Sequence, residues 1–269
     1  MFFKEKRCSS CGAHYDDKLA FCPECHHENE LSKENEKINK MCWLTVKDQL
    51  FNFLIGFLGL NIITVILSVI FSKTAQQNQT FALFIVNTLA YILVTILLIA
   101  YNFGNHLTKF LKPYFLKKDS YLYGILGAAV LLALSAICSI FADAMFPNAI
   151  SGNQDSATTL VVNYPISSII VLGILGPVVE EIAYRVGLFT LLSRTKIWIA
   201  YLVEATFFAL LHFDFTGNLL LELANLPSYL CGGLVLSYIY QKRGPAASMS
   251  AHIINNLVSI FGIILAAKL

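Results

Sequence analysis

Long apolar runs separated by short polar segments dominate the chain from about residue 48 onward. Each run is close to the ~20 residues that a membrane-spanning helix requires. The pattern predicts an all-α polytopic membrane protein with roughly seven to eight transmembrane helices. The count is eight if the fourth or the sixth run, each interrupted by Pro and Gly, forms two shorter helices. The seven runs cover residues 50–71, 81–101, 121–141, 166–189, 197–213, 219–240 and 246–267.

The polar beginning of the chain and the spacing of the runs divide the sequence into four parts. Residues 1–28 are rich in cysteine, and residues 29–47 form a charged segment that is too polar to build a core, which we interpret as a linker. The first group of predicted transmembrane helices occupies residues 48–145. A second group, at residues 160–267, carries most of the candidate chemistry.

Composition and charge place most of the chain in lipid. Hydrophobic residues make up 57% of the chain and charged residues 13%, whereas ordinary soluble domains have about 25% charged residues. The net charge of +2 is too small to indicate a nucleic-acid partner. Lys and Arg occur in alternate loops, at residues 109–118, 194–196 and 242–243. By the positive-inside rule, this alternation predicts a multi-pass protein of the cell membrane with a cytoplasmic N-terminus.

Four cysteines near the N-terminus form two CxxC pairs, Cys8 with Cys11 and Cys22 with Cys25, ten residues apart. Two such turns can present four thiolates tetrahedrally to one Zn²⁺ ion. The cysteines resemble those of a zinc ribbon, and a site with four protein ligands has no open position for catalysis. We therefore predict a structural zinc that stabilises a small module with an unknown partner. The alternative is four unliganded thiols in an unstructured tail.

The fourth apolar run contains three ionisable residues, Glu180, Glu181 and Arg185. Placing each such group at the centre of a bilayer costs about 2.5 to 3.5 kcal/mol on insertion scales, so their presence needs a reason. On a helix, Glu181 and Arg185 share a face and suit an ion pair, while Glu180 is turned about 100° away and is free to act as a general base. Just before the acids, the run is expected to break at Gly173, Gly176 and Pro177.

Two later runs carry histidines at helical spacing from a second side chain. Phe208 and His212 are four residues apart near the end of the fifth run, and His252 and Asn256 are four apart in the last. A carboxylate and a histidine together can deprotonate water, and a histidine with an amide can donate hydrogen bonds to an oxyanion. The three helices thus predict a site for amide hydrolysis, with no further cofactor firmly required.

Two other acids in apolar runs match no motif. Glu204 lies eight residues before His212, on nearly the same helix face, and we interpret it as a partner of that histidine. Glu222 remains without an assignment.

The order of the three motifs resembles that of a known protease family. EExxxR at Glu180, FxxxH at Phe208 and HxxxN at His252 occur in the sequence in the order found in the CPBP family, the CAAX prenyl protease and bacteriocin-processing group of intramembrane proteases. The resemblance covers about residues 166–261 and does not include the cysteine module. It implies an endopeptidase that acts on a membrane-associated, prenylated or peptide substrate.

The resemblance also implies a role for each motif residue. Glu180 and His212 would activate a water molecule, and His252 and Asn256 would form the oxyanion hole. The residues that would support the site are Glu181, Arg185 and Phe208.

Other functions fit the same residues. Polar side chains also hold membrane helices together, although two acids, two histidines, an arginine and an asparagine exceed what helix packing needs. A zinc-dependent metalloprotease would use Glu180, His212 and His252 as ligands. A non-catalytic scaffold or bacteriocin-immunity protein would bind a partner, instead of cleaving it.

The topology sets one condition on all of these readings. With straight helices, Glu180 and His252 would lie nearer the cytoplasm than His212 does. We expect a broken fourth helix or a short fifth helix to bring the three side chains to one depth.

Overall fold

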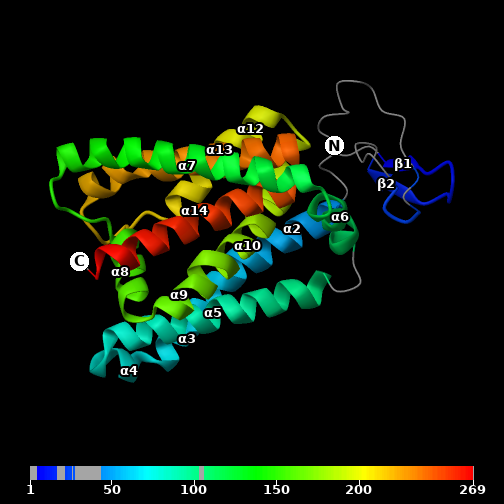
Figure 1. Cartoon of the computed structure of the whole chain (residues 1–269). Helices are drawn as coiled ribbons and strands as arrows, with labels where there is room; N and C mark the ends of the chain where they lie inside the picture. Colours follow the sequence, from blue (N-terminus) through cyan, green and yellow to red (C-terminus); the bar gives the residue numbers. More distant parts are fainter. Residues whose placement is uncertain (1–4, 17–21, 26, 28–43, 103–105, 269) are drawn as a thin grey trace.

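A computed structural model of the chain describes residues 5–16, 22–25, 27, 44–102 and 106–268. Most of the predicted linker, with Cys42, lies outside the described residues. At the N-terminus, β1 (Glu5–Arg7) and β2 (His14–Asp16) form an antiparallel pair in which Lys6 faces Tyr15. This pair belongs to the cysteine module, which is drawn beyond the end of the helical bundle where α6 lies (Figure 1).

The rest of the described chain is helical, which confirms the predicted fold class. The first half contains α2 (Val46–Leu54), the π-helical η1 (Ile55–Gly59), α3 (Leu60–Ile70), α4 (Ser72–Gln77), α5 (Gln79–Asn102), α6 (His106–Phe115) and α7 (Lys118–Met145). The second half contains α8 (Gly152–Asn163), α9 (Pro165–Ile170), the π-helical η2 (Val171–Leu175), α10 (Gly176–Glu180), the π-helical η3 (Glu181–Phe189), α11 (Thr190–Ser193), α12 (Ile197–Leu210), α13 (Leu219–Arg243) and α14 (Pro245–Ala266).

Six continuous helices in the described residues are long and apolar enough to cross a membrane. They cover Val46–Ile70, Gln79–Asn102, Lys118–Met145, Pro165–Ser193, Leu219–Arg243 and Pro245–Ala266. The seventh predicted run forms only the 14-residue α12, whose length of about 21 Å is less than the ~30 Å of a bilayer core. The expected short fifth helix is therefore present, and the structure sharpens the span count from seven or eight to six.

The expected break in the fourth span is wrong. Residues 165–193 form one continuous helix, in which a π-helical turn precedes the proline. There the N–H of Gly176 donates to the carbonyl of Val171, five residues back. Such a widened turn lets Pro177 lie within a helix without a break. The second π-helical segment, η3, contains Glu181 and Arg185, and π-helical turns of this kind occur frequently at functional sites.

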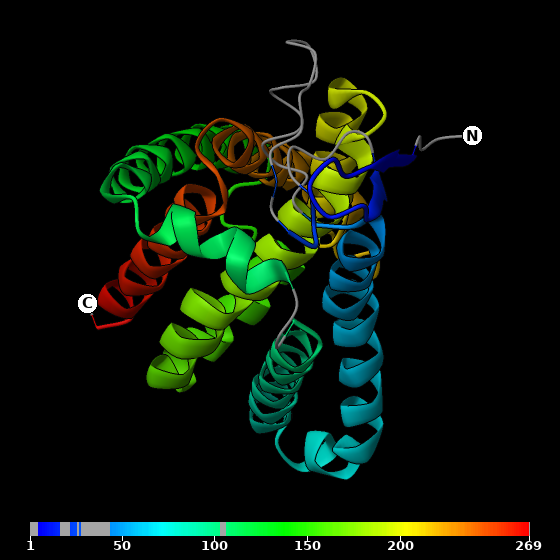
Figure 2. The same ribbon diagram turned by 90° about the vertical axis from the view of Figure 1, so that its right-hand side faces the viewer.

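The fourth helix packs against α2, α5 and α14, as two views at right angles show (Figures 1 and 2). α7, α13 and α14 pack against one another, α12 packs on α13, and α2 packs on η3. Small residues allow this last pair to approach closely. A Cβ atom at Gly56 would lie 2.4 Å from the Cβ of Ala183, and one at Gly187 would lie 2.9 Å from the backbone of Phe53.

Two features define the ends of the helices that carry the site residues. Gly244, with a φ of 88°, ends α13 and is followed by Pro245 at the first turn of α14, a pairing that stops one helix and starts the next. Arg194 is 2% exposed and donates to the side chain of Gln49 and to the carbonyl of Leu44, both at 2.8 Å. Arg194 lies in the loop between α11 and α12, where the charge pattern placed it, and it ties the end of the fourth span to the start of α2.

Candidate active site within the helical bundle

The four residues predicted to be catalytic line one small cavity. Its volume is about 140 Å³, and its walls come from α7, α10, α13 and α14 and from the end of α12. Glu180 and His212 come from the fourth span and from the turn after α12. His252 and Asn256 come from α14. His212 follows the end of the short α12 at Leu210 and lines the same cavity as the other three.

A buried ion-pair network lies behind the cavity. Arg185 Nη1 is 3.3 Å from Glu181 Oε1, the predicted pair, and Arg185 Nε is 3.5 Å from Glu204 Oε1. All three side chains are buried. The guanidinium also lies over the ring of Phe208, 4.5 Å from its centroid, which adds a cation–π attraction.

The interpretation of Glu204 as a partner of His212 is therefore corrected. Its carboxylate pairs with Arg185 and accepts a hydrogen bond from the Ser237 hydroxyl at 2.5 Å. The arginine lies between two carboxylates and pairs with both, so that loss of the arginine would leave buried carboxylates without a cation.

His252 lies between the two acids of the first motif. Its Nδ1 is 3.0 Å from Glu181 Oε1, and its Nε2 is 3.7 Å from Glu180 Oε2. A carboxylate can only accept, so Nδ1 carries a proton that it donates to Glu181, while Nε2 faces Glu180 and the cavity. Glu181 thus orients the ring, and Arg185 in turn holds Glu181.

His212 is oriented by the backbone and by two aromatic rings. Its Nδ1 lies 2.9 Å from the carbonyl oxygen of Phe208. A carbonyl can only accept, so Nδ1 donates and Nε2 keeps its lone pair. The ring stacks on Tyr229 with centroids 4.5 Å apart and contacts the Phe208 ring at 4.8 Å. Phe208 thus supports the site through both its carbonyl and its ring.

Asn256 has a defined amide orientation. Its Nδ2 donates to the carbonyl of Leu172 at 3.1 Å, and its Oδ1 accepts from Asn255 at 3.2 Å. A carboxamide has two N–H donors, and the bond to Leu172 uses one of them.

Sequence reasoning missed the roles of three residues near the cavity. Glu204 gave no sequence signal for its pairing with Arg185, because the two residues lie on different helices. Glu222 accepts hydrogen bonds from the backbone N–H groups of Gly152 at 2.8 Å and Asp214 at 3.3 Å, so it joins two loops. Tyr229 gave no local signal, because its contact with His212 depends on how α13 packs.

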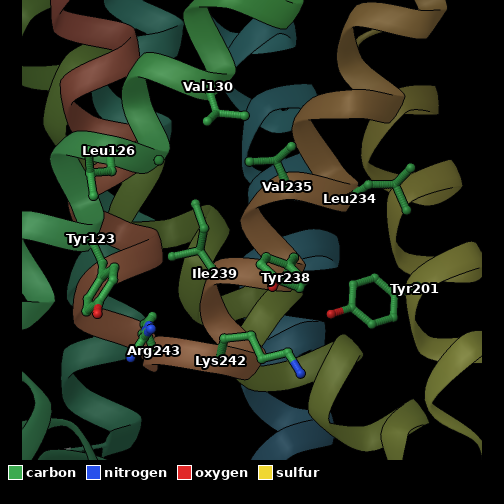
Figure 3. Close-up of a pocket in the computed structure, with 11 residues that line it drawn as sticks. Tyr123, Leu126, Val130, Tyr201, Leu234, Val235, Tyr238, Ile239, Lys242 and Arg243 are labelled. Carbon is green, nitrogen blue, oxygen red and sulfur yellow. The ribbon is translucent and has the colours of Figure 1, made fainter.

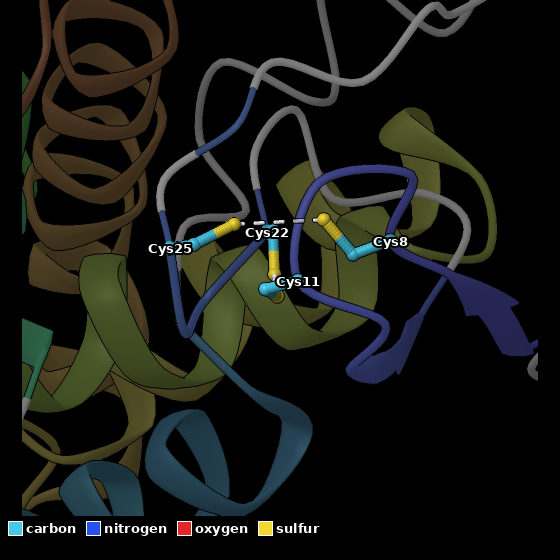
Figure 4. Close-up of side chains that lie close together, drawn as sticks. All are labelled: Cys8, Cys11, Cys22 and Cys25. Atoms are coloured by element: carbon cyan, nitrogen blue, oxygen red, sulfur yellow. Dashed lines mark hydrogen bonds between the residues drawn. The ribbon is translucent and has the colours of Figure 1, made fainter.

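The cysteines form a separate cluster (Figure 4). Their four Sγ atoms all lie within 4.8 Å of one another, with Cys8 to Cys25 and Cys11 to Cys22 both at 3.5 Å. Ideal tetrahedral coordination with Zn–S bonds of 2.3 Å puts sulfur atoms about 3.8 Å apart. The cluster could therefore hold one metal ion. In the part of the chain that the structure describes, it is the one group of three or more His, Cys, Asp or Glu with this geometry.

Local turns build the cluster. The N–H of Cys8 donates to Ala13 and the N–H of Gly12 donates back to Cys8, at 2.8 and 3.0 Å. Gly12 has a φ of 77°, which favours glycine after the first cysteine pair. Backbone N–H groups of Cys11 and Ser10 lower the pKa of the Cys8 thiol to about 6, whereas the neighbouring cysteines and burial raise the pKa of the Cys11 thiol to about 12. His26, which follows Cys25 in the sequence, lies outside the described residues.

The fold and its cavity define a multi-pass membrane protein with acid and histidine side chains gathered inside the bundle. Residues 162–258 match a family model described as Type II CAAX prenyl endopeptidase Rce1-like. This part of the chain, which includes every motif residue from Glu180 to Asn256, is similar to that CAAX protease family. The expected family resemblance is confirmed, and it supports a protease assignment at the level of the family.

Two curated proteins of Lactococcus lactis subsp. lactis (strain IL1403) are similar to this chain. UPF0177 protein YvdC is 30% identical over 146 residues, which are 54% of this chain and 52% of that protein. UPF0177 protein YxdF is 27% identical over 180 residues, 64% of this chain and 89% of that protein. The chain thus aligns with about half the length of the first relative and most of the second. No solved structure matches the chain.

Proposed function

We propose that the chain is an intramembrane endopeptidase that hydrolyses a peptide bond of a membrane-associated substrate with a water molecule activated by Glu180 and His212. The observation that carries the proposal is the shared cavity, because side chains of three motifs spread over 77 residues of sequence line about 140 Å³ of space. The match of residues 162–258 to the CAAX protease family model supports the same reaction.

The proposed reaction begins with the Glu180 carboxylate and the lone pair of His212 Nε2, which face the cavity. Glu180 takes a proton from water, which His212 Nε2 positions through a hydrogen bond. The water oxygen attacks the scissile carbonyl carbon, and the carbonyl becomes an oxyanion. Glu180 then gives the proton to the leaving amine as the C–N bond breaks, so that one carboxylic acid and one amine are formed.

Donors on α14 stabilise the oxyanion in this proposal. The second N–H of Asn256 and a protonated Nε2 of His252 would donate to it, and one such donor is typically worth about 10² to 10³ in rate. Glu181, Arg185 and Phe208 act on these groups without touching the substrate, because they hold the rings of His252 and His212 in place.

A metal has a separate place in the proposal. The cysteine cluster would hold Zn²⁺ through Cys8, Cys11, Cys22 and Cys25, and this ion would stabilise the module without taking part in hydrolysis. Glu180, His212 and His252 do not appear as a metal-ligand group among the described residues, so we derive the reaction from water and side chains. A metal content of one zinc per chain that falls to zero when the cysteines are replaced supports this division, and zinc retained in that variant supports the metalloprotease alternative.

Location and partners complete the proposal. We place the protein in the cell membrane with its N-terminus and zinc module in the cytoplasm, in contact with lipid, a peptide or protein substrate and a partner of the module.

A comparison of membrane proteomes tests the reaction. Cells carrying the full chain, its Glu180→Gln variant and a matched Asp119→Asn variant are compared for peptide fragments. Asp119 is exposed and lies outside the cavity, so this control changes an acid to an amide without touching the site. Fragments are expected with the parent and Asp119→Asn and not with Glu180→Gln. A biological effect that survives in Glu180→Gln would instead indicate a scaffold or immunity protein.

A further inference from the structure

The small cavity opens into a larger polar cleft at one end of the bundle. The cleft has a volume of about 510 Å³ and shares Ser135, His212, Ser228, Tyr229, Asn255 and Asn256 with the cavity. It continues from the cavity toward the end of α7 at Met145, where the start of α8 lines it. Its volume lies within the ~300 to 1,000 Å³ usual for binding pockets.

The other half of α7 borders an apolar groove with a volume of about 810 Å³ (Figure 3). The groove runs between α7 and α13 from Val130 to the cations Lys242 and Arg243. In the described residues, it has no lining residue in common with the cavity. Leu131, Leu236 and Ile239 belong to one buried cluster between the two spaces, so a lipid chain in the groove would be separated from Glu180 and His212.

The chemistry of the cleft suits a peptide backbone. On α7, Ser135, Ser139 and Asp143 follow one another at four-residue spacing and line the same side. Hydroxyl and amide groups dominate the rest of the lining. Such groups can both donate to carbonyls and accept from N–H groups, which is what an extended peptide in a membrane requires.

The cleft is also connected to the histidine of the cavity. Asn153, near the start of α8, donates to the hydroxyl of Tyr229 at 3.0 Å, and the ring of Tyr229 stacks on His212. Glu222 holds the N–H of Gly152 at 2.8 Å. The start of α8 thus contacts the site through Tyr229.

We propose that this polar cleft is the substrate-binding groove, and that it receives an extended peptide segment without a lipid chain from the membrane face opposite Lys242 and Arg243. By the positive-inside rule that face is the non-cytoplasmic one. The proposal rests on the proposed endopeptidase function and names its substrate class. A cytoplasmic prenylated C-terminus would instead approach from the basic end.

Photocrosslinking tests the groove without relying on turnover. The full-length Glu180→Gln chain in phosphatidylcholine nanodiscs is labelled with a diazirine-bearing octapeptide of Ser and Ala, with or without a C-terminal farnesyl cysteine. The labels are mapped by mass spectrometry. Labelling within residues 135–157 by the plain peptide, competed by excess unlabelled peptide, is expected. Labelling within residues 123–130 or 234–243, or labelling that does not compete, would overturn the proposal.

Two matched substitutions on α7 add a kinetic test in the active chain. Ser139→Phe fills the cleft and Val130→Phe fills the apolar groove. Cleavage of a quenched peptide should show a KM about 10-fold higher for Ser139→Phe and little change for Val130→Phe. Equal effects contradict the proposal, and thermal unfolding of both variants shows whether a loss comes from misfolding.

The two proposals fail in different ways. If no peptide is cleaved by the parent chain but labels still map to the cleft, the endopeptidase proposal fails and the groove stands. If peptides are cleaved but Ser139→Phe has no effect and labels map elsewhere, the groove fails and the endopeptidase stands.

Cysteine labelling tests from which face of the membrane the peptide enters the cleft. A membrane-impermeant maleimide is applied to intact cells carrying Gln154→Cys or Lys242→Cys, and labelling of the parent cysteines is subtracted. Gln154→Cys should be labelled from outside and Lys242→Cys only after permeabilisation. The reverse order would contradict the proposed side of entry.

Discussion

The cysteine cluster and the intramembrane cavity are both small groups of reactive side chains, but they are built in different ways. The cysteines are two pairs within 18 residues of sequence, and local turns at Gly12 and Cys22 bring their sulfur atoms together. The cavity residues come from separate helices, and each is oriented by a partner on another element or by its own backbone. The first group is built by local turns and could hold a metal ion, whereas the second depends on helix packing.

The difference teaches which changes should affect which property. Changes to the cavity should remove activity with the zinc content unchanged, and changes to the cysteines should do the opposite. Four predictions test this separation, in order of expected size.

Replacing the proposed bases should have the largest effect on activity. Glu180→Gln or His212→Gln should lower the rate of peptide cleavage by about 10² to 10⁴, the usual contribution of general acid–base catalysis. Zinc content, measured by atomic emission on the same purified protein, should not change. Cleavage within threefold of the parent in both variants would break the proposed assignment.

Removing the buried cation should have the largest effect on stability. Arg185→Met leaves Glu181 and Glu204 as uncompensated buried carboxylates, and breaking a buried pair typically costs about 3 to 5 kcal/mol. Unfolding in detergent should show this loss. A double variant, Arg185→Met with Glu204→Gln, should recover part of it, because one of the two buried charges is then neutral. No recovery would mean that Glu204 is not coupled to the arginine.

Asn256 should matter for rate and less for stability. Asn256→Ala removes a proposed oxyanion donor and should lower kcat by about 10² to 10³. The KM should change little, because the donor acts mainly on the transition state. The neighbouring Asn255→Ala is a matched control. An equal loss of kcat in both variants would indicate that the two amides merely orient each other.

Removing the zinc should have the smallest effect on catalysis. Cys22→Ser, or chelation of the parent, should release one metal ion per chain and leave peptide cleavage within about twofold, since the cluster has no open coordination position. Metal release should occur as the pH falls, because the thiols must be deprotonated to bind. Loss of cleavage in proportion to loss of zinc would show that the two regions are not independent.

Much of the fold and the site could be predicted because membrane helices are encoded by long apolar runs and the motifs by helical spacing. The Glu181–Arg185 pair is an example, since residues four apart on a helix are neighbours whatever surrounds them. The continuous fourth span was not predictable from Pro177, because the π-helical turn at Val171 to Gly176 depends on packing around the helix.

Contacts between residues of different helices also could not be predicted from the sequence. The eight-residue spacing of Glu204 from His212 suggested that the two are partners. The Glu204 carboxylate instead pairs with Arg185 and Ser237 of other helices. The contact of Tyr229 with His212 joins residues on α13 and at the end of α12, and no periodicity in either segment reports it. The catalytic roles of Glu180, His212, His252 and Asn256 stay predictions.

Isotope labelling tests the central claim, that Glu180 activates water for peptide hydrolysis, most directly. The parent chain and Glu180→Gln, both reconstituted in lipid with equal zinc content, are incubated with a quenched peptide in water enriched in ¹⁸O. The account predicts that the parent yields fragments with one ¹⁸O atom in each new terminal carboxyl group and that Glu180→Gln yields such fragments at least about 100-fold more slowly. Labelled fragments formed at the same rate by both proteins would contradict it.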